Sequence, residues 1–248
     1  MTLLDDLLAQ PGFTPALLIV GLIMYGAWTA AYLAIIVIGF RQKTYGVPLV
    51  CICLNVVWEF LFTFEVTDAR LHWFFIWGNG LWFFFDLVIV AQLFLYGKNA
   101  QVVPWVKDCF YPVAVGTLVA AAIGLYTFTF YFRDVKGVAS SMTMNLAMSA
   151  LFVPLLFSRP DLRGLSYAAA WLKLVGTAAG SVFLYFWWPA QFNDGRMITH
   201  AEIPEPPSYG YLVFLYVAIF ALDCLYVYLL GQQRRKIRAE LRTEKGTS

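Results

Sequence analysis

The chain has 248 residues, of which 61% are hydrophobic and only 13% are charged, so it is not an ordinary soluble domain. Seventeen Lys and Arg residues against fifteen Asp and Glu residues give a formal net charge of +2. This small excess reflects membrane topology, and it does not call for a nucleic-acid partner.

Seven stretches are long and apolar enough to cross a bilayer, for which about 20 residues suffice. In chain order they predict transmembrane helices at 16–40, 47–66, 71–96, 110–131, 138–157, 165–188 and 209–231. Because these helices use most of the chain, we predict one all-α domain over residues 1–248. It is a polytopic seven-helix membrane bundle that ends in a basic tail at 232–248.

Lys and Arg residues lie mainly on one side of the predicted bundle, in the first, third and fifth connections and in the tail. The positive-inside rule therefore predicts an amino terminus outside and a cytoplasmic carboxyl terminus. The expected location is the plasma membrane if the source is bacterial and the endoplasmic reticulum if it is fungal. The proline-rich connection at 189–208 is expected to be irregular.

Four ionisable side chains lie inside the apolar segments: Glu59, Asp86, Lys173 and Asp223. An isolated charge there costs on the order of 3 kcal/mol or more. At about 1.5 Å per helical residue, all four fall about 12–18 Å from the cytoplasmic side, in one layer. One lysine cannot compensate three carboxylates, so at least one acid is expected to be protonated, and a neutral acid in an apolar pocket is a proton donor.

Amide and aromatic side chains share helix faces with these acids, at spacings of three and four residues. An interior of this kind suits a large, mostly apolar ligand with one polar end. The predicted pocket residues are Asn55, Trp58, Phe62, Asn79, Trp82, Asp86, Asn145, Tyr216, Phe220 and Tyr226.

Each of these residues also has a purely structural interpretation. The amides can be hydrogen-bonding links between helices, and the aromatic residues can face lipid or fill the core. Asp86 and Lys173 can neutralise one another and hold two helices together.

Motifs for metal and phosphate chemistry are missing from the sequence. Both histidines, His72 and His200, fall in predicted outer connections, and no DDxxD, DxDD, HExxH or glycine-rich phosphate loop occurs. We therefore expect no metal site and no cofactor.

The chain resembles the small seven-helix integral-membrane terpene cyclases of meroterpenoid and indole-terpenoid pathways. The resemblance covers nearly the whole chain and is carried by Asn55 with Trp58-Glu59-Phe60, by Trp82 with Asp86, and by Asp223 in an aromatic last helix. It implies an isomerase- or lyase-type enzyme that starts cyclisation by protonating a terminal alkene or epoxide of a prenylated substrate. It also implies that Glu59 and Asp223 are the acidic catalytic residues.

The expected partners are this prenylated small molecule and membrane lipid, with no obligate protein partner. Two other hypotheses stay open from the sequence. Buried acids also serve as proton relays, so a proton-coupled transporter or a seven-helix receptor is one alternative. The other is a structural membrane protein whose charges only hold helices together.

Overall fold

A computed structural model of the chain describes residues 3–10, 12–66, 71–101, 103–132, 134, 136–193 and 209–246. Every regular element within these ranges is helical, which confirms the all-α prediction. The elements are α1 (Leu3–Leu8), α2 (Pro15–Gln42), α3 (Leu49–Thr63), α4 (Trp73–Tyr96), the 3-10 turn η1 (Lys98–Ala100), α5 (Pro104–Asp108), α6 (Phe110–Tyr131), α7 (Val138–Phe157), α8 (Tyr167–Asn193) and α9 (Tyr209–Gly246).

Six of the described helices are long and apolar enough to cross a membrane: α2, α4, α6, α7, α8 and α9. Helix α3 has only 15 residues, or about 22 Å of helix, against a hydrocarbon core of about 30 Å. The predicted range 47–66 is therefore too long. Pro48 precedes the first turn, and Glu65, two residues beyond the last turn, has a left-handed φ of 50°. The count of seven crossings and the orientation stay predictions.

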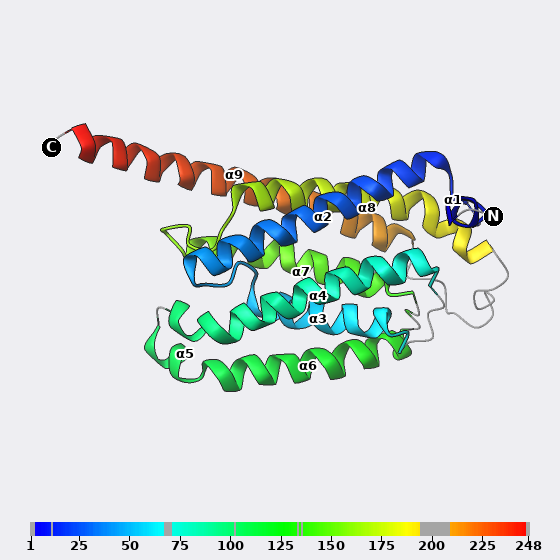
Figure 1. Cartoon of the computed structure of the whole chain (residues 1–248), viewed down its shortest axis with the longest axis horizontal. Coiled ribbons are helices and arrows are strands. Elements are labelled where there is room, and N and C mark those ends of the chain that lie inside the picture. Colours follow the sequence, from blue (N-terminus) through cyan, green and yellow to red (C-terminus); the bar gives the residue numbers. More distant parts are fainter. Residues whose placement is uncertain are drawn as a thin grey trace.

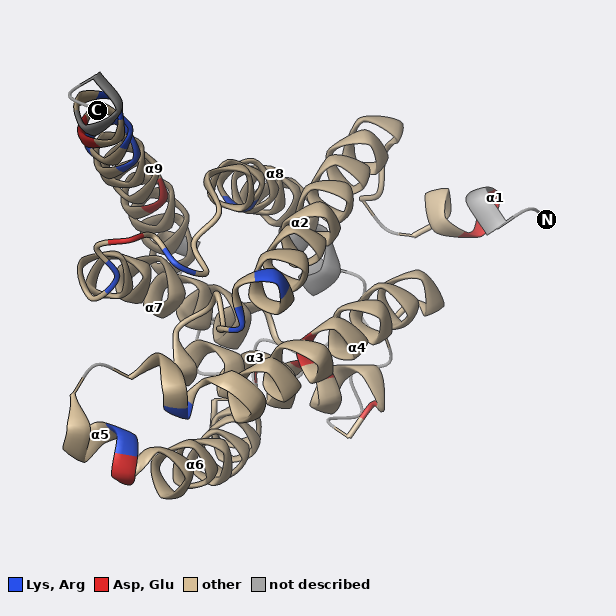
Figure 2. Cartoon of the chain, turned by 60° about the vertical axis from the view of Figure 1, so that its left-hand side comes forward, with Lys and Arg blue, Asp and Glu red and all other residues tan. Residues whose placement is uncertain are grey.

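The ends of two other helices also differ from the sequence prediction. Helix α8 continues to Asn193, so the first part of the connection predicted at 189–208 is helical, and residues 194–208 lie outside the described part. Helix α9 continues through the basic tail as far as Gly246 and projects beyond the bundle (Figure 1). Most of the bundle carries no charge, whereas the projecting end of α9 carries several (Figure 2).

The helices form a ring of six around the interior. In order around the ring, α2, α4, α3, α7, α9 and α8 each contact the next, and α8 contacts α2 again. Helix α6 lies outside the ring, mainly against α3 (Figures 1 and 2). Helix α1 and the end of α9 lie at opposite ends of the molecule. The interior is therefore lined by helices distant in sequence.

The turn into α7 is fixed by close contact between backbone and aromatic rings. Gly137 has a left-handed φ of 73°, and a Cβ atom there would lie 2.5 Å from Phe62 Cζ and 2.7 Å from Trp58 Cζ2. Asp134 accepts hydrogen bonds from the backbone N–H groups of Ala139 (3.0 Å) and Ser140 (2.7 Å). These contacts hold the start of α7 against α3.

We expect Gly137→Ala to destabilise the protein by about 2 kcal/mol, because the methyl group meets two packed rings and the backbone conformation disfavours a side chain. The matched control is Gly124→Ala in the middle of α6, where a Cβ atom would meet nothing within 4 Å. Alanine should leave stability there unchanged or raise it by up to about 1 kcal/mol. Thermal unfolding in detergent measures both, and equal melting temperatures for the two variants would contradict the packing described.

Candidate active site

A cavity of about 200 Å³ lies inside the ring of helices. Among the described residues, its walls come from α2, α3, α4, α7 and α8, together with Leu71, Lys136 and Gly137 from the connections at one end. A second cavity of about 30 Å³ adjoins it and extends toward the opposite end, where Gly46 and Ser166 line it. The two cavities share the lining residues Trp28, Tyr32, Asn55 and Met148.

Glu59 is the acid in the wall of the large cavity. Its side chain is only 6% exposed, and its Oε2 atom has no hydrogen-bond partner in the described part of the chain. Asn55 lies one helical turn away and lines the same cavity. A buried carboxyl with an unpaired oxygen is costly unless a ligand or a proton satisfies it.

Aromatic side chains line the same cavity as this acid, and hydrogen bonds and ring stacking hold them in place. Trp58 donates its indole N–H to Ser140 Oγ at 2.9 Å, and Trp82 donates to Thr29 Oγ1 at 3.2 Å. The ring of Tyr25 stacks on Trp82 with centroids 4.7 Å apart. Because the polar edges of both indoles are satisfied within the protein, ring faces are left to meet an apolar ligand.

Asp86 lines the small cavity and is 2% exposed. Tyr32 donates its hydroxyl hydrogen to Asp86 Oδ2 at 3.2 Å, and Asn55 Nδ2 donates to Tyr32 Oη at 3.5 Å. These three side chains come from α2, α3 and α4, which are neighbours in the ring. Tyr32 and Asn55 therefore connect the small cavity to the large one.

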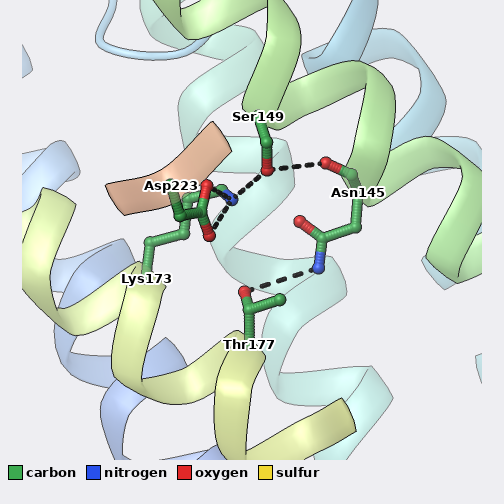
Figure 3. Close-up of polar contacts among 5 residues, drawn as sticks. All are labelled: Asn145, Ser149, Lys173, Thr177 and Asp223. Carbon is green, nitrogen blue, oxygen red and sulfur yellow. Dashed lines mark hydrogen bonds and ion pairs between the residues drawn. The ribbon is translucent and has the colours of Figure 1, made fainter. Parts of the chain in front are cut away.

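Lys173 and Asp223 form a buried ion pair (Figure 3). Lys173 Nζ lies 2.6 Å from Asp223 Oδ1 and 2.8 Å from Oδ2, and it also donates to Ser149 Oγ at 2.7 Å. Ser149 donates in turn to the backbone oxygen of Asn145 at 2.9 Å, and Asn145 Nδ2 donates to Thr177 Oγ1 at 3.4 Å. This network joins α7, α8 and α9.

The suggested neutralisation of Asp86 by Lys173 is wrong as a direct ion pair. Helix α8 contacts α9 in the ring, whereas α2 lies between α8 and α4. The ammonium group therefore reaches Asp223 on the adjacent helix. Lys173 and Asp86 only line the same small cavity.

Most of the predicted pocket residues line a cavity. Glu59 and five of them line the large one: Asn55, Trp58, Asn79, Trp82 and Asn145. Asp86 and Tyr226 line the small one.

Four predicted site residues line neither cavity: Phe62, Tyr216, Phe220 and Asp223. Phe62 is fully buried behind Trp58, with ring centroids 4.5 Å apart, and Tyr216 packs in a core cluster with Leu212 and Ile219. Asp223 is buried and paired with Lys173, and Phe220 is 50% exposed on the outer face of α9. Ile219 lies on the buried face of α9, whereas the next residue, Phe220, does not, because successive helical residues point about 100° apart.

The prediction missed three aromatic residues of α2 that line the large cavity: Tyr25, Trp28 and Tyr32. Their spacing of three and four residues puts them on one helix face. That pattern is visible in the sequence. However, the first apolar segment contains no charged residue, and the pocket was predicted from aromatic residues near buried charges.

A helical membrane bundle around a cavity with a buried acid and aromatic walls is typical of a membrane protein that binds an apolar small molecule. The family model described as Pyr4-like transmembrane terpene cyclases matches residues 14–236, so the chain belongs to this family. The match confirms the resemblance carried by the sequence motifs, and it does not favour the transporter and receptor hypotheses.

Individual relatives match over most of their length. The Pyr4-family terpene cyclase mfmH of Annulohypoxylon moriforme is 26% identical over 221 residues, which covers 87% of this chain and 85% of the relative. Asnovolin H synthase nvfL of Aspergillus novofumigatus is 25% identical over 218 residues, covering 85% and 83%. The terpene cyclase pyr4 of Aspergillus fumigatus is 25% identical over 222 residues, covering 84% and 83%. No solved structure gives a significant match.

Proposed function

We propose that this membrane terpene cyclase starts cyclisation of a prenylated substrate by protonating its terminal alkene or epoxide without a metal, and that Glu59 is the proton donor. The observation that carries the proposal is the place of the Glu59 carboxyl. It lies in the wall of the large cavity with an unpartnered oxygen and is almost fully buried.

The chemistry requires an acid where water is scarce, since water would quench a carbocation before ring closure. The Glu59 O–H bond breaks, its proton bonds to the epoxide oxygen or the alkene carbon, and the cation formed is attacked by the next double bond of the polyene. Trp28, Trp58 and Trp82 line the cavity. Aromatic ring faces stabilise a passing positive charge by about 1–2 kcal/mol when desolvated.

Asp223 has a different place in the proposal. Asp223 lines neither cavity and its carboxylate is held by Lys173, so we assign Asp223 the role of counter-ion to Lys173 and not that of proton donor. Its effect on the reaction passes through Lys173 and through Asn145, whose side chain lines the cavity.

The test is to incubate membranes containing the protein with farnesylated and geranylgeranylated aromatic acceptors, with and without a terminal epoxide. We expect at least one acceptor to give a cyclised product, identified by mass spectrometry and NMR, in the presence of a metal chelator. Membranes without the protein are the control. Uptake of unchanged acceptors into proteoliposomes with no new compound would contradict the proposal and favour transport.

A further inference from the structure

Protonation by Glu59 explains only the first step, because a cyclised cation must still lose a proton to give a neutral product. The group that takes this proton must reach the large cavity, and it must contact a second group that can accept a proton from it. Asp223 lines neither cavity and is held by Lys173 at 2.6 Å and 2.8 Å.

Tyr32 meets both requirements. Its side chain lines the large cavity as well as the small one, and its hydroxyl donates to Asp86 Oδ2 at 3.2 Å. Asn55 Nδ2 contacts the same hydroxyl at 3.5 Å, and Asn55 lies one turn of α3 from Glu59. Asn55, Glu59 and Tyr32 all line the large cavity, so the initiating acid and the Tyr32 hydroxyl face the same space.

The ring of Tyr32 is fixed by its neighbours. It packs against Trp82, Phe85 and Trp28 with centroids 6.5, 5.8 and 6.2 Å apart, and the residue is 6% exposed. The hydroxyl therefore keeps one position between the two cavities. A fixed acceptor can determine which hydrogen of the cation is removed.

Building on the proposed function, we propose that Tyr32 takes the proton that ends cyclisation and passes its own proton to Asp86. A C–H bond next to the cationic carbon breaks, its electron pair becomes the new double bond, and the proton bonds to Tyr32 Oη. At the same time the original O–H bond of Tyr32 breaks and its proton goes to Asp86 Oδ2. A cation and a carboxylate become an alkene and a carboxylic acid.

Asp86 is suited to accept the proton. Its Oδ2 atom accepts the hydrogen bond of the Tyr32 hydroxyl at 3.2 Å, so the oxygen that would receive the proton already contacts the group that would release it. A cavity of about 30 Å³ with several polar lining groups has room for a water molecule. Return of the proton from Asp86 to Glu59 restores both acids, so the cycle needs no co-reactant. Asp86 acts through Tyr32 and is a positioning residue.

The test compares Tyr32→Phe and Asp86→Asn with the wild-type protein, using an epoxyfarnesyl hydroxybenzoate as the probe. Tyr32→Phe keeps the ring and removes only the hydroxyl. We expect both variants still to consume the probe in a single turnover, because initiation uses Glu59, while the wild-type alkene falls about tenfold relative to alkene isomers and water-quenched alcohols. The control is Tyr228→Phe, which removes an exposed hydroxyl from the outer face of α9.

The outcomes separate the two proposals. An unchanged product ratio in folded Tyr32→Phe protein overturns the role of Tyr32, as does complete loss of probe consumption, which would place Tyr32 in the first step. Tyr32→Phe that changes the products while Asp86→Asn does not would overturn the transfer to Asp86. Failure of the wild-type protein to cyclise any probe would instead overturn the proposed function.

Discussion

Glu59→Gln is expected to lower cyclisation by about 100- to 10,000-fold, the range that a positioned general acid contributes. The carboxamide has nearly the same shape as the protonated acid and lines the cavity in the same way, but it is too weak an acid to protonate an alkene or an epoxide. Rates of product formation by purified protein in lipid nanodiscs measure the effect.

The matched control is Glu65→Gln. Glu65 lies just beyond the end of α3 and is exposed, so the same chemical change there should leave the rate within about twofold. Melting temperatures of both variants show whether the fold is kept. A folded Glu59→Gln protein with a near-normal rate would remove Glu59 from the role of donor.

Loss of one partner of the Lys173–Asp223 pair is expected to have the largest effect on stability. Lys173→Met leaves Asp223 buried without a cation, and Asp223→Leu leaves the ammonium group without its carboxylate; each side chain is at most 6% exposed. Breaking a buried pair in this way costs about 3–5 kcal/mol.

The double variant Lys173→Met with Asp223→Leu should recover most of this loss, to within about 1 kcal/mol of the wild type, because no unpaired charge remains. Ser149 keeps its bond to the backbone of Asn145 in that variant. Unfolding in detergent with added denaturant measures all three proteins. A double variant no more stable than the single ones would show that the two charges do not act as a pair.

The fold was largely predictable because hydrophobicity alone places long helices. Helix α6 and helix α7 begin and end where the apolar segments predict. Helix α3 is shorter than its apolar stretch, because Pro48 precedes its first turn and the chain leaves the helical conformation at Glu65. The short helices α1 and α5 were not predicted, since pieces of five or six residues have no periodicity to recognise.

The acidic residues of the site were predictable from the sequence, but the ion pair that Lys173 forms was not. Charge in an apolar segment singled out Glu59 and Asp86, and both line cavities. The partner of Lys173 depends on which helices are neighbours, and spacing within one helix carries no information on that. The wrong placement of Phe220 in the pocket has a similar cause. A stripe of aromatic residues defines one face of a helix, but it does not show whether that face points to the interior of the bundle or to lipid.

A structure of the Glu59→Gln protein with the epoxyfarnesyl hydroxybenzoate probe bound tests the central claim most directly. We expect the terminal epoxide oxygen to lie about 2.6–3.2 Å from the side chain of residue 59, the reach of a general acid, with the polyene folded against Trp58 and Trp82. A terminal epoxide bound away from residue 59, for example in the outer groove between α3, α4 and α6 that Phe60 and Phe83 line, would contradict the account.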